Sequence, residues 1–91
     1  MGGAALILSE RLRVLHHEQY SKEHDKLHND QELLDAALAY IFIVLGNDSG
    51  ADSLWPFEDD GFKPVDDPIR NLVIAGQFIA AEIDRLQDEK V

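Results

Sequence analysis

The stretch from Ala36 to Leu45 carries no charged residue, and it constrains the fold of this chain more than any other feature. Its apolar side chains fall on two adjoining helical stripes: Leu34, Leu38, Ile41 and Leu45, and Leu33, Ala37 and Tyr40. A helix that is apolar nearly all round is buried on several sides. We therefore expect a helix over about 30–45, ending at Gly46, at the centre of the domain.

A second helix is expected over about 4–19. Leu8, Leu12 and Leu15 recur at spacings of four and three, which places them on one face of a helix. This periodicity predicts that the three leucines pack inward and that Glu10 and Arg13 face water.

A third helix is expected over about 68–88. Asp67 is a favourable N-cap, and Pro68 fits the first helical position, where its missing N–H costs nothing. The apolar positions that follow recur every three or four residues: Ile69, Leu72, Val73, Gly76, Ile79, Ala80, Ile83 and Leu86. This pattern predicts one continuous buried face.

Shorter features separate these helices. Ser21 is a favourable N-cap for a helical turn over about 22–28, and Asn29 with Glu32 forms a capping-box pattern before the central helix. Residues 46–66 are rich in Gly, Asp, Ser and Pro, which predicts a long loop. The sequence thus predicts a single all-α domain over 1–91: a small antiparallel three-helix bundle with one extra short helical turn and a long loop before the last helix.

Composition narrows the class of protein. With no cysteine among 91 residues, a disulfide framework is excluded, and the apolar run at the start is too short for a signal peptide or a membrane span, so we expect a cytoplasmic protein. The net charge of −10 disfavours direct nucleic-acid binding, because phosphates would be repelled. An acidic surface suits a partner with a basic surface, and a chain this small also favours a homo-oligomer. Self-association is expected through the alanines near residue 37 or through the face that bears Gly76.

One candidate site is a group of histidines and carboxylates. His24 and His28 are four residues apart, and Asp25 and Glu32 are close enough in sequence to complete a divalent-metal site. The simpler interpretation is that His24 and Asp25 hydrogen-bond backbone groups at a corner between helices.

A second candidate is a carboxylate site of the kind found in all-α nucleotide pyrophosphohydrolases. Glu32 and Asp35 have helical spacing, and Glu82 could face them to hold Mg²⁺. The doubled acidic pairs typical of those enzymes are absent, and one such pair is expected by chance among 18 acidic residues.

The third candidate is the loop before the last helix. It combines three aromatic residues with consecutive acids and one lysine: Trp55, Phe57, Glu58, Asp59, Asp60, Phe62 and Lys63. Exposed aromatics beside charge are effective interface anchors, whereas buried ones would close the open end of the bundle. Both arrangements are compatible with the sequence.

Several fragments resemble, in order, a family of short proteins encoded by tailed phages and prophages, whose function is generally unassigned. The resemblance rests on Tyr20–Asp25 with His28, on Glu32–Tyr40, on Trp55–Phe57 with Phe62–Pro64, and on Asp67–Gly76 running into Ala81–Leu86. The chain departs from the family pattern at Tyr20, where tryptophan is usual, and at Gly76 and Gln77, which interrupt an alanine-rich stretch. The resemblance implies a mobile-element origin.

The function that the sequence favours is that of a non-catalytic accessory protein, with no catalytic residues and no cofactor, which binds a host protein through its acidic and aromatic surface. One alternative is a metal-dependent nucleotide hydrolase, which would need a divalent cation. Another is an oligomer that binds a small ligand.

Overall fold

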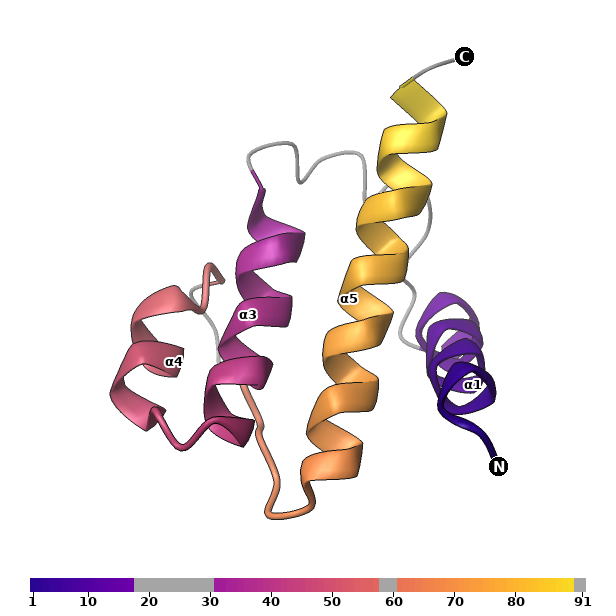
Figure 1. The fold of residues 1–91 in the computed structure, drawn as a ribbon. Helices are drawn as coiled ribbons and strands as arrows, with labels where there is room; N and C mark the ends of the chain where they lie inside the picture. The colour runs from indigo at the N-terminus through magenta and orange to yellow at the C-terminus, as the bar shows by residue number, and fades with distance from the viewer. Residues whose placement is uncertain (18–30, 58–60, 90–91) are drawn as a thin grey trace.

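The computed structural model describes residues 1–17, 31–57 and 61–89 (Figure 1). Four helices make up this part of the chain: α1 (Gly3–His17), α3 (Glu32–Val44), α4 (Asp48–Leu54) and α5 (Pro68–Glu89). No strand occurs within these ranges, so the all-α prediction is confirmed for them. The turn expected over 22–28 lies outside the described residues. No helix in the described ranges has the length and apolar character needed to cross a membrane.

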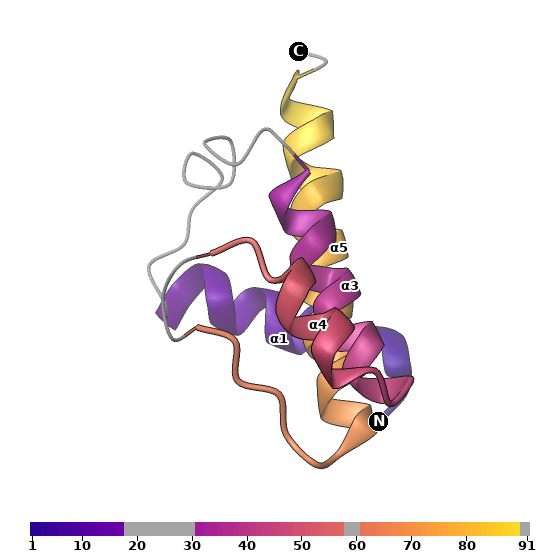
Figure 2. The same cartoon turned by 90° about the vertical axis from the view of Figure 1, so that its left-hand side faces the viewer.

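The helices form two inner and two outer elements. Helices α3 and α5 run antiparallel and side by side, α4 covers the outer side of α3, and α1 lies against the opposite side of α5 (Figure 1). Figure 2 shows that α1 runs across α5 rather than alongside it. The sequence predicted a small antiparallel three-helix bundle with helix 30–45 central; in the described residues α1 contacts α5 but not α3, so α3 and α5 share the interior.

The uncharged stretch forms the core only in part: its alanines are buried as expected, whereas Leu34, Leu38 and Leu45 of the predicted stripe are 39%, 41% and 71% exposed. Ala36, Ala37 and Ala39 are at most 2% exposed. Ala37 and Tyr40 pack with Ala75 of α5, and larger side chains close around them: Ile41, Trp55, Phe62, Ile74 and Phe78. The small alanine side chains let α5 approach α3 closely, so this face is used within the chain and is not available for self-association.

Two of the predicted helix ends are confirmed. Gly46 has φ +84° and ends α3 in a Schellman motif, in which the Gly46 and Asn47 N–H groups donate to the carbonyls of Ile43 and Phe42. At the start of α5, Asp67 Oδ1 accepts the N–H of Ile69 at 2.9 Å.

The capping box predicted before α3 is wrong. The N-cap is Gln31, in the left-handed region at φ 61°, and its side chain makes no capping bond. Glu32 is the first helical residue, and Asn29 lies outside the described residues.

The predicted loop 46–66 contains the short helix α4. Asn47 provides its N-cap, with Oδ1 accepting the Gly50 N–H at 2.9 Å. Ala51 is fully buried against the core. The loop composition concealed this helix because asparagine and serine serve equally well in turns and at helix starts.

The faces of α1 and α5 differ from the prediction. Leu8 is 59% and Leu12 45% exposed, whereas Glu10 is buried at 6%. On α5 the buried side includes Gln77 and Glu82, and most of the predicted apolar face is exposed. The spacing of apolar residues identifies an apolar stripe on a helix but not which element packs against it. Here hydrogen bonds and ion pairs between α1 and α5 determine which sides of the two helices face each other.

The crossing of α1 and α5 depends on a glycine. A Cβ placed on Gly76 would lie 2.5 Å from Cδ1 and 2.7 Å from Cγ1 of Ile7. Gly76 therefore lets the Ile7 side chain pack directly against the α5 backbone.

The Gly76→Ala variant tests this contact. We expect a net loss of about 1 kcal/mol, because overpacking of about 1–3 kcal/mol outweighs a gain of about 1 kcal/mol in helix propensity. In an Ile7→Ala background the same substitution should stabilise the protein, since the obstructing side chain is gone. Chemical denaturation of the four members of the double-mutant cycle measures the coupling. Equal effects of Gly76→Ala in both backgrounds would contradict the crossing.

Candidate functional site

The aromatic residues singled out in the sequence gather at one side of the core. Trp55 stacks on Phe62 with ring centroids 5.0 Å apart, and Phe57 meets Trp55 edge-on at 5.2 Å. Tyr40 of α3 contacts Phe62 edge-on at 5.1 Å and Phe78 of α5 lies 6.0 Å from Trp55. We call these five residues the aromatic cluster. Trp55, Phe57 and Phe62 are all half-buried, so they close the core and still present part of their surface.

Two polar contacts fix the segment that follows the cluster. The Lys63 N–H donates to the Tyr40 hydroxyl at 3.1 Å. Asn71 of α5, only 2% exposed, accepts the Val65 N–H through Oδ1 at 3.0 Å and donates from Nδ2 to the Val65 carbonyl at 2.7 Å. Asn71 was missed from the sequence as a structural residue. The detectable signal was an amide on the flank of an apolar helix, where a buried amide needs backbone partners.

The Trp55 indole N–H is enclosed and has no hydrogen-bond partner in the described part of the protein. An unsatisfied buried donor costs about 1–3 kcal/mol. In the described part of the protein, ring contacts hold the Trp55 side chain, while its backbone N–H donates to the Ala51 carbonyl at 3.2 Å.

Exposed acidic side chains flank the aromatic cluster in the sequence, on α4 and in the segment before α5. Asp48, Asp52, Asp66 and Asp67 are exposed, while Glu58, Asp59 and Asp60 lie outside the described residues. Between residues 27 and 69 the sequence has ten acids and only one base, Lys63. Almost all of the net charge of −10 thus comes from this part of the chain.

Arg11, Arg13 and Arg70 form ion pairs at the contact between α1 and α5, where Asp67 also lies beside Arg70. Arg11 is 5% exposed; its Nη2 lies 3.0 Å from Asp84 Oδ2 and its Nη1 donates to Gln77 Oε1 at 2.7 Å. Within α5, Arg85 pairs with both oxygens of Glu82 at 2.7 and 3.0 Å. These charges are buried in matched pairs, as burial requires.

Glu10 forms ion pairs with two arginines. Its carboxylate lies 2.7 Å from Arg13 Nη2 and 2.9 Å from Arg70 Nη1, which ties α1 to the first turn of α5. Burial raises the pKa of Glu10, but hydrogen bonds and charge interactions with Arg13 and Arg70 outweigh that effect and hold the pKa below its ordinary value of 4.5.

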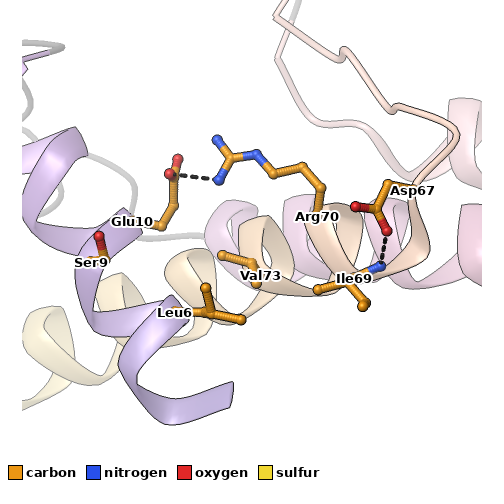
Figure 3. A pocket seen from close by; sticks show the side chains of 7 residues that line it. All are labelled: Leu6, Ser9, Glu10, Asp67, Ile69, Arg70 and Val73. Atoms are coloured by element: carbon orange, nitrogen blue, oxygen red, sulfur yellow. Dashed lines mark hydrogen bonds and ion pairs between the residues drawn. The ribbon is translucent and has the colours of Figure 1, made fainter. Parts of the chain in front are cut away.

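A hollow of about 250 Å³ lies beside this ion pair (Figure 3). Leu6 and Val73 form apolar parts of its lining, and the Arg70 side chain extends across it to Glu10. The hollow is smaller than most ligand pockets. Its one arginine is already paired, so the observed geometry does not favour the small-ligand alternative.

The proposed metal ligands are only partly described. His24, Asp25 and His28 lie outside the described residues, and Glu32 is half-buried at the start of α3. Within residues 1–17, 31–57 and 61–89 no three His, Asp or Glu side chains form a group that could hold a metal ion. In particular, Glu82 is bound by Arg85 and does not form a site with Glu32 and Asp35.

The fold and site define an all-α protein in which a half-buried aromatic cluster is flanked in the sequence by acidic residues. No protein-family model, no curated protein and no solved structure matches this chain significantly.

The lowered pKa of Glu10 predicts a pH-dependent contribution to stability. Because the folded pKa lies below the unfolded one, the contribution is complete above about pH 4.5 and is lost as the pH falls through the folded pKa. We expect Glu10→Gln to cost about 1–2 kcal/mol at neutral pH, and the difference from the parent protein to shrink below that pH. Urea denaturation across pH measures this, with Asp66→Asn as the exposed control. A difference that persists unchanged in acid would contradict the ion pair.

A second prediction follows from the unpaired indole N–H of Trp55. Trp55→Phe should change stability by less than about 1 kcal/mol, because removing an unsatisfied N–H offsets the lost ring area. Trp55→Ala should cost about 2–4 kcal/mol, since it opens a cavity beside Phe62 and Phe78. Thermal and chemical denaturation of both variants make the comparison; equal losses would mean that the indole N–H has a partner.

Proposed function

We propose that this chain is a non-catalytic accessory protein, of the kind that phages and prophages encode, which binds a basic surface of a host protein. The binding surface consists of the exposed acids of α4 and the segment before α5, together with the accessible parts of Trp55, Phe57 and Phe62. The acids Glu58, Asp59 and Asp60 and the base Lys63 belong to it by sequence. The mobile-element origin rests on the family resemblance alone.

The observation that carries this proposal is the separation of charge. The acids between residues 27 and 69 outnumber the bases by ten to one, whereas the arginines of α1 and α5 are all held in ion pairs. A surface with one sign of charge attracts a partner of the opposite sign and raises its association rate. The exposed carboxylates therefore favour a basic partner.

The aromatic cluster adds an apolar component to this surface. Tryptophan and tyrosine are enriched among the anchors of protein interfaces, which lie in well-packed pockets from which water is excluded. Trp55 and Phe57 are already half-buried and ordered by their neighbours, so a partner would lose little entropy in covering them.

The buried carboxylates, in contrast, serve the fold. Glu10 and Glu82 are each bound by arginine at hydrogen-bonding distance. For Glu10 this pairing holds the pKa below its ordinary value, which stabilises its charged form. Their arrangement supports a structural role.

A capture experiment with matched charge variants tests the proposal. The immobilised protein is exposed to an extract of the host at low and high salt, and the retained proteins are identified and then purified for direct titration. We expect a partner with a basic surface, whose affinity falls with salt and falls at least about tenfold for Asp52→Asn/Asp66→Asn.

The control carries the same change of two charge units outside the acidic surface. Ala5→Lys/His16→Lys places it at exposed positions of α1. If both double variants weaken binding equally, the loss of affinity depends on the net charge of the protein and not on the position of the acidic surface. Binding that is insensitive to salt and to both variants would contradict an acidic docking surface.

A further inference from the structure

The apolar stripe of α5 is a strongly periodic feature that lies outside the core and outside the acidic surface. It consists of six positions separated by 3, 4, 3, 4 and 3 residues: Ile69, Leu72, Gly76, Ile79, Ile83 and Leu86. This is the a/d spacing of a coiled coil, sustained over five intervals. At 1.5 Å per residue it extends about 26 Å along the helix.

The five large side chains of this α5 stripe are exposed. Their exposed fractions are 62% for Ile69, 46% for Leu72, 40% for Ile79, 51% for Ile83 and 43% for Leu86. Single exposed aliphatic residues are ordinary, but a continuous aliphatic stripe on a monomer marks an interaction surface.

The segments outside the described ranges contain few apolar side chains that could cover the stripe. The residues outside the described ranges are 18–30, 58–60 and 90–91. Among them, the only large apolar side chains are Tyr20, Leu27 and Val91. Such polar segments cannot supply the aliphatic area that five isoleucines and leucines require.

The charges near the stripe distinguish between possible partners. In α1 and α5 together, four arginines face five carboxylates, a net charge of −1 against −9 for residues 27–69, and each arginine is in an ion pair. This part of the surface therefore carries little of the excess negative charge that would select a basic partner. It also has little of the like-charge repulsion that would keep two acidic chains apart.

We propose that the α5 stripe is the contact between two copies of this chain. A helix with a 3–4 aliphatic repeat is complementary to another helix with the same repeat, since side chains of one fit between those of the other. In a two-fold dimer the same surface is used by both copies, so one stripe satisfies both partners. Ile7, packed on Gly76, fills the only position of the repeat that has no side chain.

This inference goes beyond the proposed function and is independent of it. The α5 stripe is aliphatic and near-neutral, whereas the acidic surface lies on α4 and the segment before α5. A dimer would display two copies of the acidic surface, but either could exist without the other.

The first experiment measures mass in solution by sedimentation equilibrium over a range of protein concentrations. We expect a dimer, and we expect Ile79→Lys/Ile83→Lys to weaken it at least about a hundredfold, because charge would be buried at the contact. Leu45→Lys/Val65→Lys is the control, since these exposed aliphatic residues lie off the stripe. Circular dichroism verifies that each variant folds.

A cross-linking experiment makes the test independent of affinity. The chain has no cysteine, so Ile79→Cys introduces a single thiol near the middle of the stripe, close to its own copy whichever way the helices run. A short bismaleimide should join two Ile79→Cys chains and leave Leu45→Cys chains separate. A monomer at every concentration, or a dimer unaffected by Ile79→Lys/Ile83→Lys and joined as well at Leu45→Cys, would overturn the proposal.

Discussion

The burial of Arg11 is the constraint on which the arrangement of α1 and α5 depends. A guanidinium that is 5% exposed must be neutralised and hydrogen-bonded, and Gln77 and Asp84 supply those contacts. The side of α1 that faces α5 carries Ile7, Glu10, Arg11 and Val14, and Leu8 and Leu12 lie off that side and are exposed. The same pairing orients α5, because the side that holds Gln77 and Asp84 faces α1. The aliphatic stripe of α5 is thereby left at the surface.

The contact between α3, α4 and α5 is held by different interactions. There α3 and α5 meet through small side chains, and the space at the edge of that contact is filled by aromatic rings of the segment that follows α4, together with Tyr40 of α3 and Phe78 of α5. Asn71 and the Tyr40 hydroxyl secure that segment by pairing with its backbone, which has no regular partner of its own. Acidic residues can accumulate on this side because the structure there is held by ring contacts and backbone bonds rather than by ion pairs.

The structure could be predicted from the sequence where a single local pattern determines it. The uncharged run around Ala37 predicted a buried helix, and Gly46 and Asp67 marked two of the helix ends. The sequence was insufficient where the outcome depended on contacts distant in sequence. Nothing local to Glu10 indicates that Arg70 lies within reach, so a face read as solvent-exposed is buried. The aromatic residues were found, but their half-buried state depends on α4, whose residues are equally typical of a loop.

The position of Trp55 has a consequence for spectroscopy. It is the only tryptophan in the chain, and it is stacked on Phe62 at the junction of α4, α3 and α5. Its emission therefore reports on this corner and is insensitive to whether α1 remains docked through its ion pairs. Comparing fluorescence with far-ultraviolet dichroism during unfolding would thus separate the release of the aromatic corner from the loss of helix, and would reveal whether the two sides of the molecule behave as one cooperative unit.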